Sequence, residues 1–190
     1  MDRSRAPACR GILRVLLGGW LGLVGWFIAA PGHAGAGAAP ERQLRAAPAE
    51  AKPDFVLSSL DGPSHDLRQQ AGRVVLVHFF ATWCEPCRDE LSSLASLARM
   101  PGIERPLILA INVAEVPARV RRFLEGTALD FPVLLDSDRA VTKAWDVHAL
   151  PTTYVLDRSL TPRLVVEADL DWTKEDVVAA LRRVAEPASR

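Results

Sequence analysis

The hydrophobic and polar positions of this chain change their period several times between residues 53 and 187. Residues 74–80 read Val-Val-Leu-Val-His-Phe-Phe, a nearly unbroken apolar run that predicts a strand covered on both faces. After Cys87, apolar residues recur at helical spacing through Leu97, until Met100-Pro101-Gly102 ends the pattern. The sequence therefore predicts a central strand that is followed directly by a helix.

The remaining segments predict further strands and helices. We expect strands over residues 55–57 and 65–67 as a hairpin, and over 107–113, 131–135, 152–156 and 164–168; we expect helices from Pro117, over 141–145 and over 177–184, the last one capped by Thr173-x-x-Asp176. The two strands nearest the C-terminus are close enough in sequence to be antiparallel. The predicted fold class is α/β, with a mixed sheet and helices on both faces.

An apolar segment near the N-terminus is predicted to direct export. Residues 15–32 contain no Asp, Glu, Lys, Arg or His, and four arginines precede them. Cleavage among the small residues after Ala34 or Ala36 would release a soluble domain, whereas retention would leave an anchor in the inner membrane. We therefore expect a periplasmic protein with three parts: a signal peptide or membrane anchor at residues 1–36, a flexible linker at 37–52 and a folded domain at 53–187.

Charge and cysteine content exclude several classes of function. The 190 residues include 23 Lys or Arg and 23 Asp or Glu, so no net charge attracts nucleic acid. Three cysteines are too few for a disulfide scaffold, and Cys9 lies before the apolar segment, away from the other two. Cys84 and Cys87 lack the second ligand pair of a structural zinc site, so no metal ion or other cofactor is expected.

The segment Trp83-Cys84-Glu85-Pro86-Cys87 lies at the predicted junction of strand and helix. Unpaired N–H groups at a helix start favour a thiolate, so Cys84 is the expected nucleophile, and Cys87 is expected to resolve the mixed disulfide. Pro86 suits the first helical turn. Glu85 adds negative charge beside the thiolate, which would make the dithiol more reducing. An inert bridge and a metal-binding pair are the alternatives.

Several segments together resemble a known family. FFATWCEPC at residues 79–87, INV at 111–113, FPVLLDSDRAVTKAWDV at 131–147 and LPTTYVLD at 150–157 resemble the TlpA/ResA-like thiol–disulfide oxidoreductases, exported or membrane-tethered members of the thioredoxin superfamily. The resemblance covers about residues 53–187. It implies a thioredoxin fold with an N-terminal hairpin and an extra helix and strand between the two halves.

The resemblance also implies roles for individual residues. Pro151 should be a cis-proline that faces the disulfide, and the backbone of Leu150 should pair with a bound client chain. Trp83, Glu85 and Pro86 would line the same substrate groove. Glu90, three residues after the second cysteine, matches an acidic residue that tunes the thiols or accepts their protons. An ordinary surface glutamate on the helix is the alternative.

His78 departs from the family pattern. At this position, six residues before Cys84, thioredoxins carry a buried Asp, and TlpA/ResA-like proteins commonly carry Asn or another residue. His78 is either a buried histidine held by one hydrogen bond or a titratable proton helper for Cys87. Trp145 and Trp172 are interpreted as core or edge packing.

The expected function is the reduction of client disulfides outside the cytoplasm. The family implies apocytochrome c cysteines or cysteine ligands of copper sites as clients, and a membrane thiol-reducing protein as electron donor. A disulfide oxidant is one alternative, and a Cu(I)-binding chaperone that adds a histidine such as His148 to the two cysteines is another. An exported peroxidase would need Thr three residues before its reactive cysteine, where this sequence has Ala81.

Overall fold

The apolar run at residues 74–80 forms β4 (Val75–Phe80), whose six side chains are all buried. In the computed structural model, which describes residues 42–48 and 50–186, β4 lies between two other strands. It pairs in parallel with β5 (Leu107–Val113) and antiparallel with β7 (Thr152–Leu156). A strand with neighbours on both edges and helices on both faces has no solvent-facing side, which explains the missing polar alternation.

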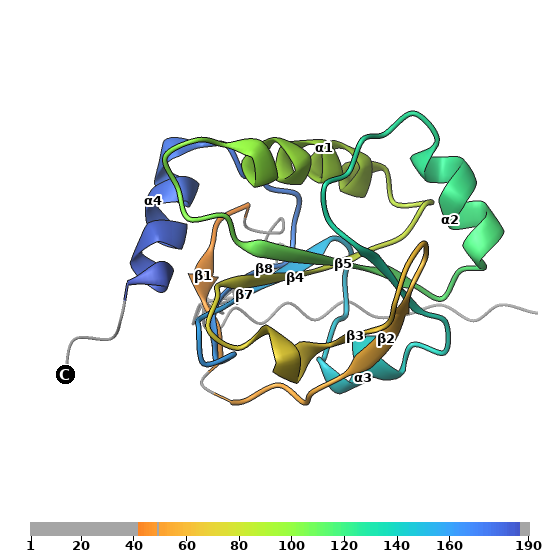
Figure 1. Cartoon of the computed structure of the whole chain (residues 1–190), viewed down its shortest axis with the longest axis horizontal. Helices are drawn as coiled ribbons and strands as arrows, with labels where there is room; N and C mark the ends of the chain where they lie inside the picture. The colour runs from red at the N-terminus through yellow and green to blue at the C-terminus, as the bar shows by residue number, and fades with distance from the viewer. Residues whose placement is uncertain (1–41, 49, 187–190) are drawn as a thin grey trace, which may run out of the picture. The chain divides into compact units, whose positions relative to one another are not determined.

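The sheet is mixed, as predicted, and has eight strands in the order β1-β8-β7-β4-β5-β6-β2-β3 (Figure 1). Its outer strands are β1 (Arg45–Ala46), β8 (Pro162–Val166), β6 (Val133–Asp136), β2 (Val56–Ser59) and β3 (His65–Asp66). β6 runs parallel to β5, whereas β8 is antiparallel to β7 and β2 is antiparallel to β6. β2 and β3 form the predicted N-terminal hairpin.

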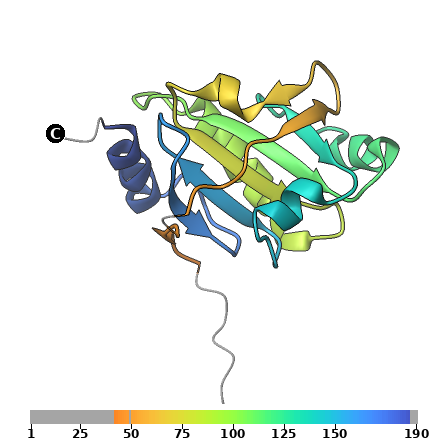
Figure 2. The ribbon, with the colours of Figure 1, turned by 90° about the horizontal axis from the view of Figure 1, so that it is seen from below.

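Both faces of the sheet are covered by helices (Figures 1 and 2). The helical elements are η1 (Leu67–Gln70), α1 (Glu85–Arg99), α2 (Pro117–Leu124), α3 (Ala140–Ala144) and α4 (Glu175–Ala185). Leu76 packs with residues of α1 and α4, and Phe80 packs with residues of α1 and α2. Val77 and Phe79 point to the opposite face, toward η1 and α3. His78 alternates with Leu76 and Phe80 and therefore faces α1.

The described fold begins earlier than the sequence predicts. Arg45 and Ala46 pair with Val165 and Leu164 of β8, and the Ala47 N–H donates to the Arg163 carbonyl oxygen at 2.9 Å. The prediction of a flexible linker over residues 37–52 is therefore wrong for β1. Residues 37–41 and the predicted export segment at residues 1–36 lie outside the described residues. Within the described residues, no helix is long and apolar enough to cross a membrane.

The predicted cap of the last helix is also wrong. α4 begins at Glu175, and Lys174 occupies the N-cap position without a side-chain hydrogen bond to the helix. The Thr173 hydroxyl donates instead to the Asp171 carboxylate at 2.6 Å, within a local turn that competes with helix capping. In addition, β8 begins and ends two residues before the predicted strand.

Trp145 lies at the centre of the core face opposite α1. It is 1% exposed, and its ring centroid lies 5.8 Å from that of Phe55, 5.8 Å from that of Phe79 and 5.4 Å from that of Tyr154. Its indole N–H donates to the Pro53 carbonyl oxygen at 2.9 Å. The sequence interpretation of Trp145 as a packing residue is confirmed.

We expect Trp145→Ala to lower the free energy of unfolding by about 3 to 5 kcal/mol, because it opens a cavity in a packed core. Trp83→Ala is the matched control, since the Trp83 side chain is 66% exposed. The control is expected to change the free energy of unfolding by less than about 0.5 kcal/mol. Urea unfolding of both oxidised proteins measures the difference, and equal losses would contradict this account of the core.

Candidate active site

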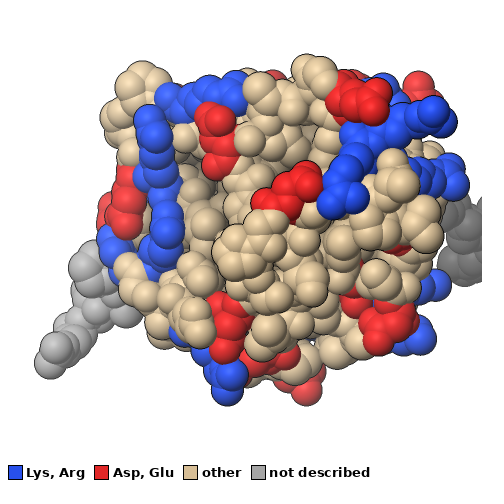
Figure 3. All heavy atoms as spheres, turned by 45° about the vertical axis from the view of Figure 1, so that its right-hand side comes forward, with Lys and Arg blue, Asp and Glu red and all other residues tan. Residues whose placement is uncertain are grey.

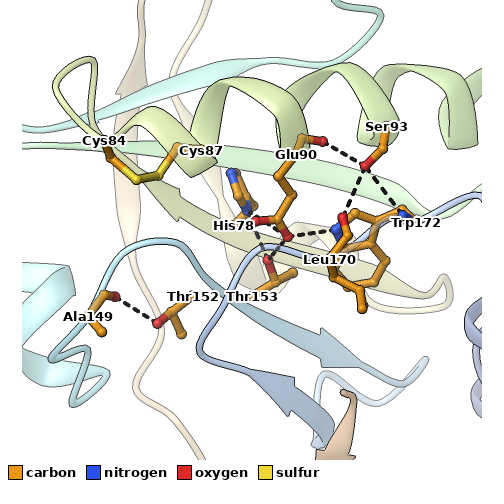
Figure 4. Close-up of polar contacts among 10 residues, drawn as sticks. All are labelled: His78, Cys84, Cys87, Glu90, Ser93, Ala149, Thr152, Thr153, Leu170 and Trp172. Atoms are coloured by element: carbon orange, nitrogen blue, oxygen red, sulfur yellow. Dashed lines mark hydrogen bonds and ion pairs between the residues drawn. A yellow bond between two sulfur atoms is a disulfide. The ribbon is translucent and has the colours of Figure 1, made fainter. Parts of the chain in front are cut away.

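The two cysteines lie where the central strand passes into α1 (Figure 4). Cys84 is the N-cap residue of α1, and Pro86 occupies the first helical turn, as expected. Cys84 and Cys87 form a disulfide with their Cα atoms 5.4 Å apart. Cys84 keeps 5% of its surface exposed, whereas Cys87 is completely buried. A reagent in solvent therefore reaches the Cys84 end of the disulfide first.

Two of the residues predicted to form a substrate groove, Trp83 and Leu150, line one cavity near the start of α1. This cavity of about 260 Å³ is also lined by His148 and neighbouring residues. The peptide bond between Leu150 and Pro151 is cis, as the resemblance implied, and Leu150 packs against the cluster that contains both cysteines. The predicted groove residues Glu85 and Pro86 are exposed on the first turn of α1. Their contact with a client remains a prediction.

Glu90 lies one turn after Cys87 on the buried face of α1. Its Oε1 accepts the Trp172 indole N–H at 2.7 Å and the Thr153 hydroxyl at 3.3 Å. Burial raises the pKa of Glu90 to about 8, although both hydrogen bonds act in the opposite direction. The alternative of an ordinary surface glutamate is therefore wrong: Glu90 is a buried carboxyl group that is mostly protonated at neutral pH.

His78 lies directly beside Glu90. Its Nδ1 is 2.9 Å from the Thr153 hydroxyl oxygen and 3.9 Å from Glu90 Oε1, and the imidazole is completely buried. Burial lowers the pKa of His78 to about 3, so the ring is neutral in the folded protein. The expectation of a buried histidine held by one hydrogen bond is confirmed, and its role as a proton helper stays a prediction.

A second buried acidic residue, which the sequence analysis missed, holds the loop before Cys84. Glu115 accepts the Thr82 N–H at 2.7 Å, the Thr82 hydroxyl at 2.6 Å and the Asn112 amide at 2.8 Å. Burial would raise the pKa of Glu115, but these hydrogen bonds and the charge of Arg119 lower it overall. The ionised carboxylate therefore anchors the loop that carries Trp83 and Cys84.

The sequence contains a signal for Glu115 but none for the hydrogen bond of Trp172. Asn112 breaks an otherwise apolar strand, and Glu115 follows that strand, so a buried polar contact between them could have been proposed. The hydrogen bond from Trp172 had no signal in the sequence, because a buried tryptophan is interpreted as a packing residue whether or not its N–H donates to a residue distant in sequence.

The described residues do not bring together three His, Cys, Asp or Glu side chains in a way that would hold a metal ion. His148, the histidine considered for a copper site, is exposed and lies 2.9 Å from the Asp146 carboxylate.

On the face drawn in Figure 3, basic and acidic side chains lie among one another. Cys84, Cys87 and the buried Glu90 all lie within the first two turns of α1.

Comparison with known proteins places the chain in a family. The family model described as the AhpC/TSA family matches residues 48–161. The thiol–disulfide oxidoreductase ResA of Geobacillus thermodenitrificans is 36% identical over 135 residues, which cover 70% of this chain and 75% of that protein. The chain belongs to the AhpC/TSA family, as a ResA-like thiol–disulfide oxidoreductase. A second ResA-like relative, ResA of Bacillus subtilis, is 37% identical over 105 residues, covering 55% of this chain and 59% of that protein.

Solved structures agree with the ResA-like fold. A secreted thiol–disulfide isomerase from Corynebacterium glutamicum has a TM-score of 0.61 and 26% identity, and the match covers 71% of this chain and 86% of that one. StoA from Bacillus subtilis has a TM-score of 0.59 and 20% identity, covering 73% and 100% of the two chains. The predicted thioredoxin fold of this ResA-like protein is confirmed.

The pH dependence of unfolding tests the buried site of this ResA-like protein. The raised pKa of Glu90 means that the folded state binds more protons than the unfolded state between pH 4.5 and about 8, so stability falls as pH rises through this window. The lowered pKa of His78 acts oppositely between about pH 3 and 6.5, where stability rises with pH. We therefore expect the fall to appear mainly above pH 6.5.

Glu90→Gln keeps the shape of the side chain but does not titrate. Glu90→Gln is expected to abolish the fall in the free energy of unfolding with rising pH. The steepest slope of that fall is about 1.4 kcal/mol per pH unit. Glu85→Gln, at an exposed position on the same helix, is the matched control and should leave the fall unchanged. Urea unfolding of the oxidised proteins at a series of pH values provides the measurement. A fall that persists in Glu90→Gln would show that another group causes it.

Proposed function

We propose that this protein reduces disulfide bonds in client proteins outside the cytoplasm, through the dithiol form of Cys84 and Cys87. The observation that carries the proposal is the unequal setting of the two cysteines. Cys84 has an exposed edge, whereas Cys87 is buried one helical turn from a carboxyl group that burial keeps protonated. A client disulfide therefore meets Cys84 first, and Cys87 exchanges its proton inside the protein.

In the first half-reaction, two electrons pass from the protein to the client. The Cys84 thiolate attacks one client sulfur, the client S–S bond breaks, and the other client sulfur leaves as a thiolate that takes a proton from water. Cys87 then gives its thiol proton to the Glu90 carboxylate and attacks the Cys84 sulfur. The bond to the client breaks, the second client thiolate leaves and takes a proton from water, and the Cys84–Cys87 disulfide forms beside a neutral Glu90.

In the second half-reaction, a donor dithiol returns the two electrons. One donor thiolate attacks the Cys84 sulfur, the more accessible end of the disulfide, and Cys87 leaves with the electron pair of the broken S–S bond. The leaving sulfur takes the proton that neutral Glu90 holds. The second donor thiolate then displaces Cys84 as a thiolate, and the donor becomes a disulfide.

Two carboxyl groups support the reducing direction. Exposed Glu85 follows Cys84 directly, and Glu90 becomes a buried carboxylate when it gives its proton to Cys87. Both place negative charge near sulfur atoms that can be anionic only in the reduced protein. Destabilising the reduced form lowers the reduction potential, whereas stabilising it makes a strong oxidant.

The groove and the N-terminal sequence support the proposed clients and location. Trp83, the neighbour of Cys84, and Leu150 contribute apolar surface to a cavity that suits an extended peptide segment, such as the haem-attachment region of apocytochrome c or a copper-site loop. The apolar residues 15–32 support export to the periplasm. Because that compartment is oxidising, the reaction requires a membrane protein that supplies thiol electrons.

Trapping experiments test this reaction. In a Cys9→Ser background, which removes the third thiol, Cys87→Ser is expected to accumulate a mixed disulfide with an oxidised C-x-x-C-H peptide, because release from Cys84 is blocked. Cys84→Ser in the same background should form none. Non-reducing electrophoresis and mass spectrometry identify the adduct. Trapping through Cys87 instead of Cys84 would contradict the proposed order of attack.

A further inference from the structure

A chain of buried hydrogen bonds next to the disulfide joins residues that are distant in sequence (Figure 4). His78 on β4 contacts Thr153 on β7, Thr153 contacts Glu90 on α1, and Trp172, shortly before α4, contacts the same carboxyl oxygen. At most 2% of any of these four residues is exposed. Among the described residues, His78 Nε2 and Glu90 Oε2 have no hydrogen-bond partner.

The directions of these hydrogen bonds follow from Trp172. An indole N–H only donates, so Glu90 Oε1 accepts it at 2.7 Å. In a neutral carboxyl group the carbonyl oxygen is the better acceptor, so Oε1 takes that role. Thr153 then donates its hydroxyl hydrogen to the same oxygen. The Thr153 oxygen is left to accept a hydrogen bond, and His78 must supply it. The neutral imidazole therefore carries its proton on Nδ1.

The proton of neutral Glu90 then belongs on Oε2. Oε1 already accepts two hydrogen bonds, and Oε2 has no partner among the described residues. Cys87 lies one turn earlier on the same buried face of α1. If Thr153 turned its hydroxyl away, the Glu90 proton could move to Oε1 and donate to the Thr153 oxygen. That proton would then no longer be on the oxygen that is free to exchange with Cys87.

We propose that His78 is a positioning residue that acts through Thr153 to hold the Glu90 proton on Oε2, ready for exchange with Cys87. The inference rests on the proposed reaction of the Cys84–Cys87 disulfide. When a thiolate bonds to Cys84 and the S–S bond breaks, Cys87 leaves with the electron pair and takes the proton from Oε2. His78 itself neither gains nor loses a proton.

The titratable groups around Glu90 are consistent with this neutral role of His78. They are His78 on β4, whose Nδ1 lies 3.9 Å from Glu90 Oε1, Asp169 in the segment between β8 and α4, and Cys87 one turn earlier on α1. Burial is the main cause that raises the pKa of Glu90, and the charge of Asp169 adds to it. Burial also lowers the pKa of His78 to about 3. At neutral pH, His78 therefore acts through its hydrogen bond and not through a positive charge.

Three substitutions of His78 separate its two nitrogen atoms. His78→Leu removes both, His78→Asn keeps a donor near the Nδ1 position, and His78→Gln keeps a polar group near the Nε2 position. Two measurements on the oxidised protein need no client: the rate at which dithiothreitol thiolate opens the disulfide at pH 7, and the apparent pKa of Glu90 from the infrared band of its protonated carboxyl group. A protein that failed to reduce clients would still give both results.

We expect His78→Leu to slow the opening of the disulfide by about tenfold, a modest part of the range over which positioned proton transfer accelerates reactions. The apparent pKa of Glu90 should rise, because the orienting hydrogen bond that favours its ionised form is lost. His78→Asn should restore the opening rate to within about twofold of that of the unmodified protein, since one retained hydrogen bond is sufficient. His78→Gln should behave as His78→Leu does.

Substitutions of Thr153 keep the test decisive if replacing His78 prevents folding. Thr153→Val removes the relaying hydroxyl and should reproduce both effects of His78→Leu, whereas Thr153→Ser keeps the hydroxyl and should reproduce neither. Rescue by His78→Gln and not by His78→Asn would overturn the proposal and assign proton transfer to Nε2. Unchanged opening rates and carboxyl titrations in His78→Leu or Thr153→Val would also overturn it.

Discussion

The burial of the Glu90 carboxyl group is the constraint on which the active site depends. A carboxylate at this position would lack water, so Glu90 holds a proton up to about pH 8, and Trp172 and Thr153 satisfy only one of its two oxygens. The sheet and α1 keep this acid one helical turn from Cys87, while Cys84 keeps a small exposed fraction of 5%. The fold thus separates the sulfur that meets other molecules from the sulfur that exchanges a proton internally.

A second set of polar contacts holds the loop that carries Cys84. Thr82 donates its backbone N–H and its hydroxyl to Glu115, which follows β5, so the loop between β4 and α1 is tied to the neighbouring strand. Glu115 and Glu90 have opposite charge states because burial and hydrogen bonding oppose each other at both residues. The hydrogen bonds that Glu115 accepts and the charge of Arg119 lower its pKa in spite of burial, whereas burial outweighs the two hydrogen bonds that Glu90 accepts and raises its pKa.

The sequence predicted those parts of the fold and site that depend on local patterns. The apolar run of β4, the helical spacing of α1 and the position of Cys84 at the helix start can all be seen within short windows. β1 could not be predicted, because Arg45-Ala46 carries no strand signal and becomes a strand only by pairing with β8. Trp172 and Glu90 lie 82 positions apart in the sequence, so no local sequence pattern predicts their contact. His78 was found because it interrupts an apolar strand, but its partner Thr153 is visible only in the assembled sheet.

The reduction potential of the Cys84–Cys87 pair tests the central claim most directly. It is measured by equilibrating the purified protein with dithiothreitol buffers of known potential and quantifying the two thiols, with Cys84→Ser as the blank. The account predicts a value near or below that of thioredoxin, about −270 mV, because Glu85 and Glu90 disfavour the reduced form. A value near that of a strong disulfide oxidant, about −120 mV, would contradict the assignment of this protein as a reductant.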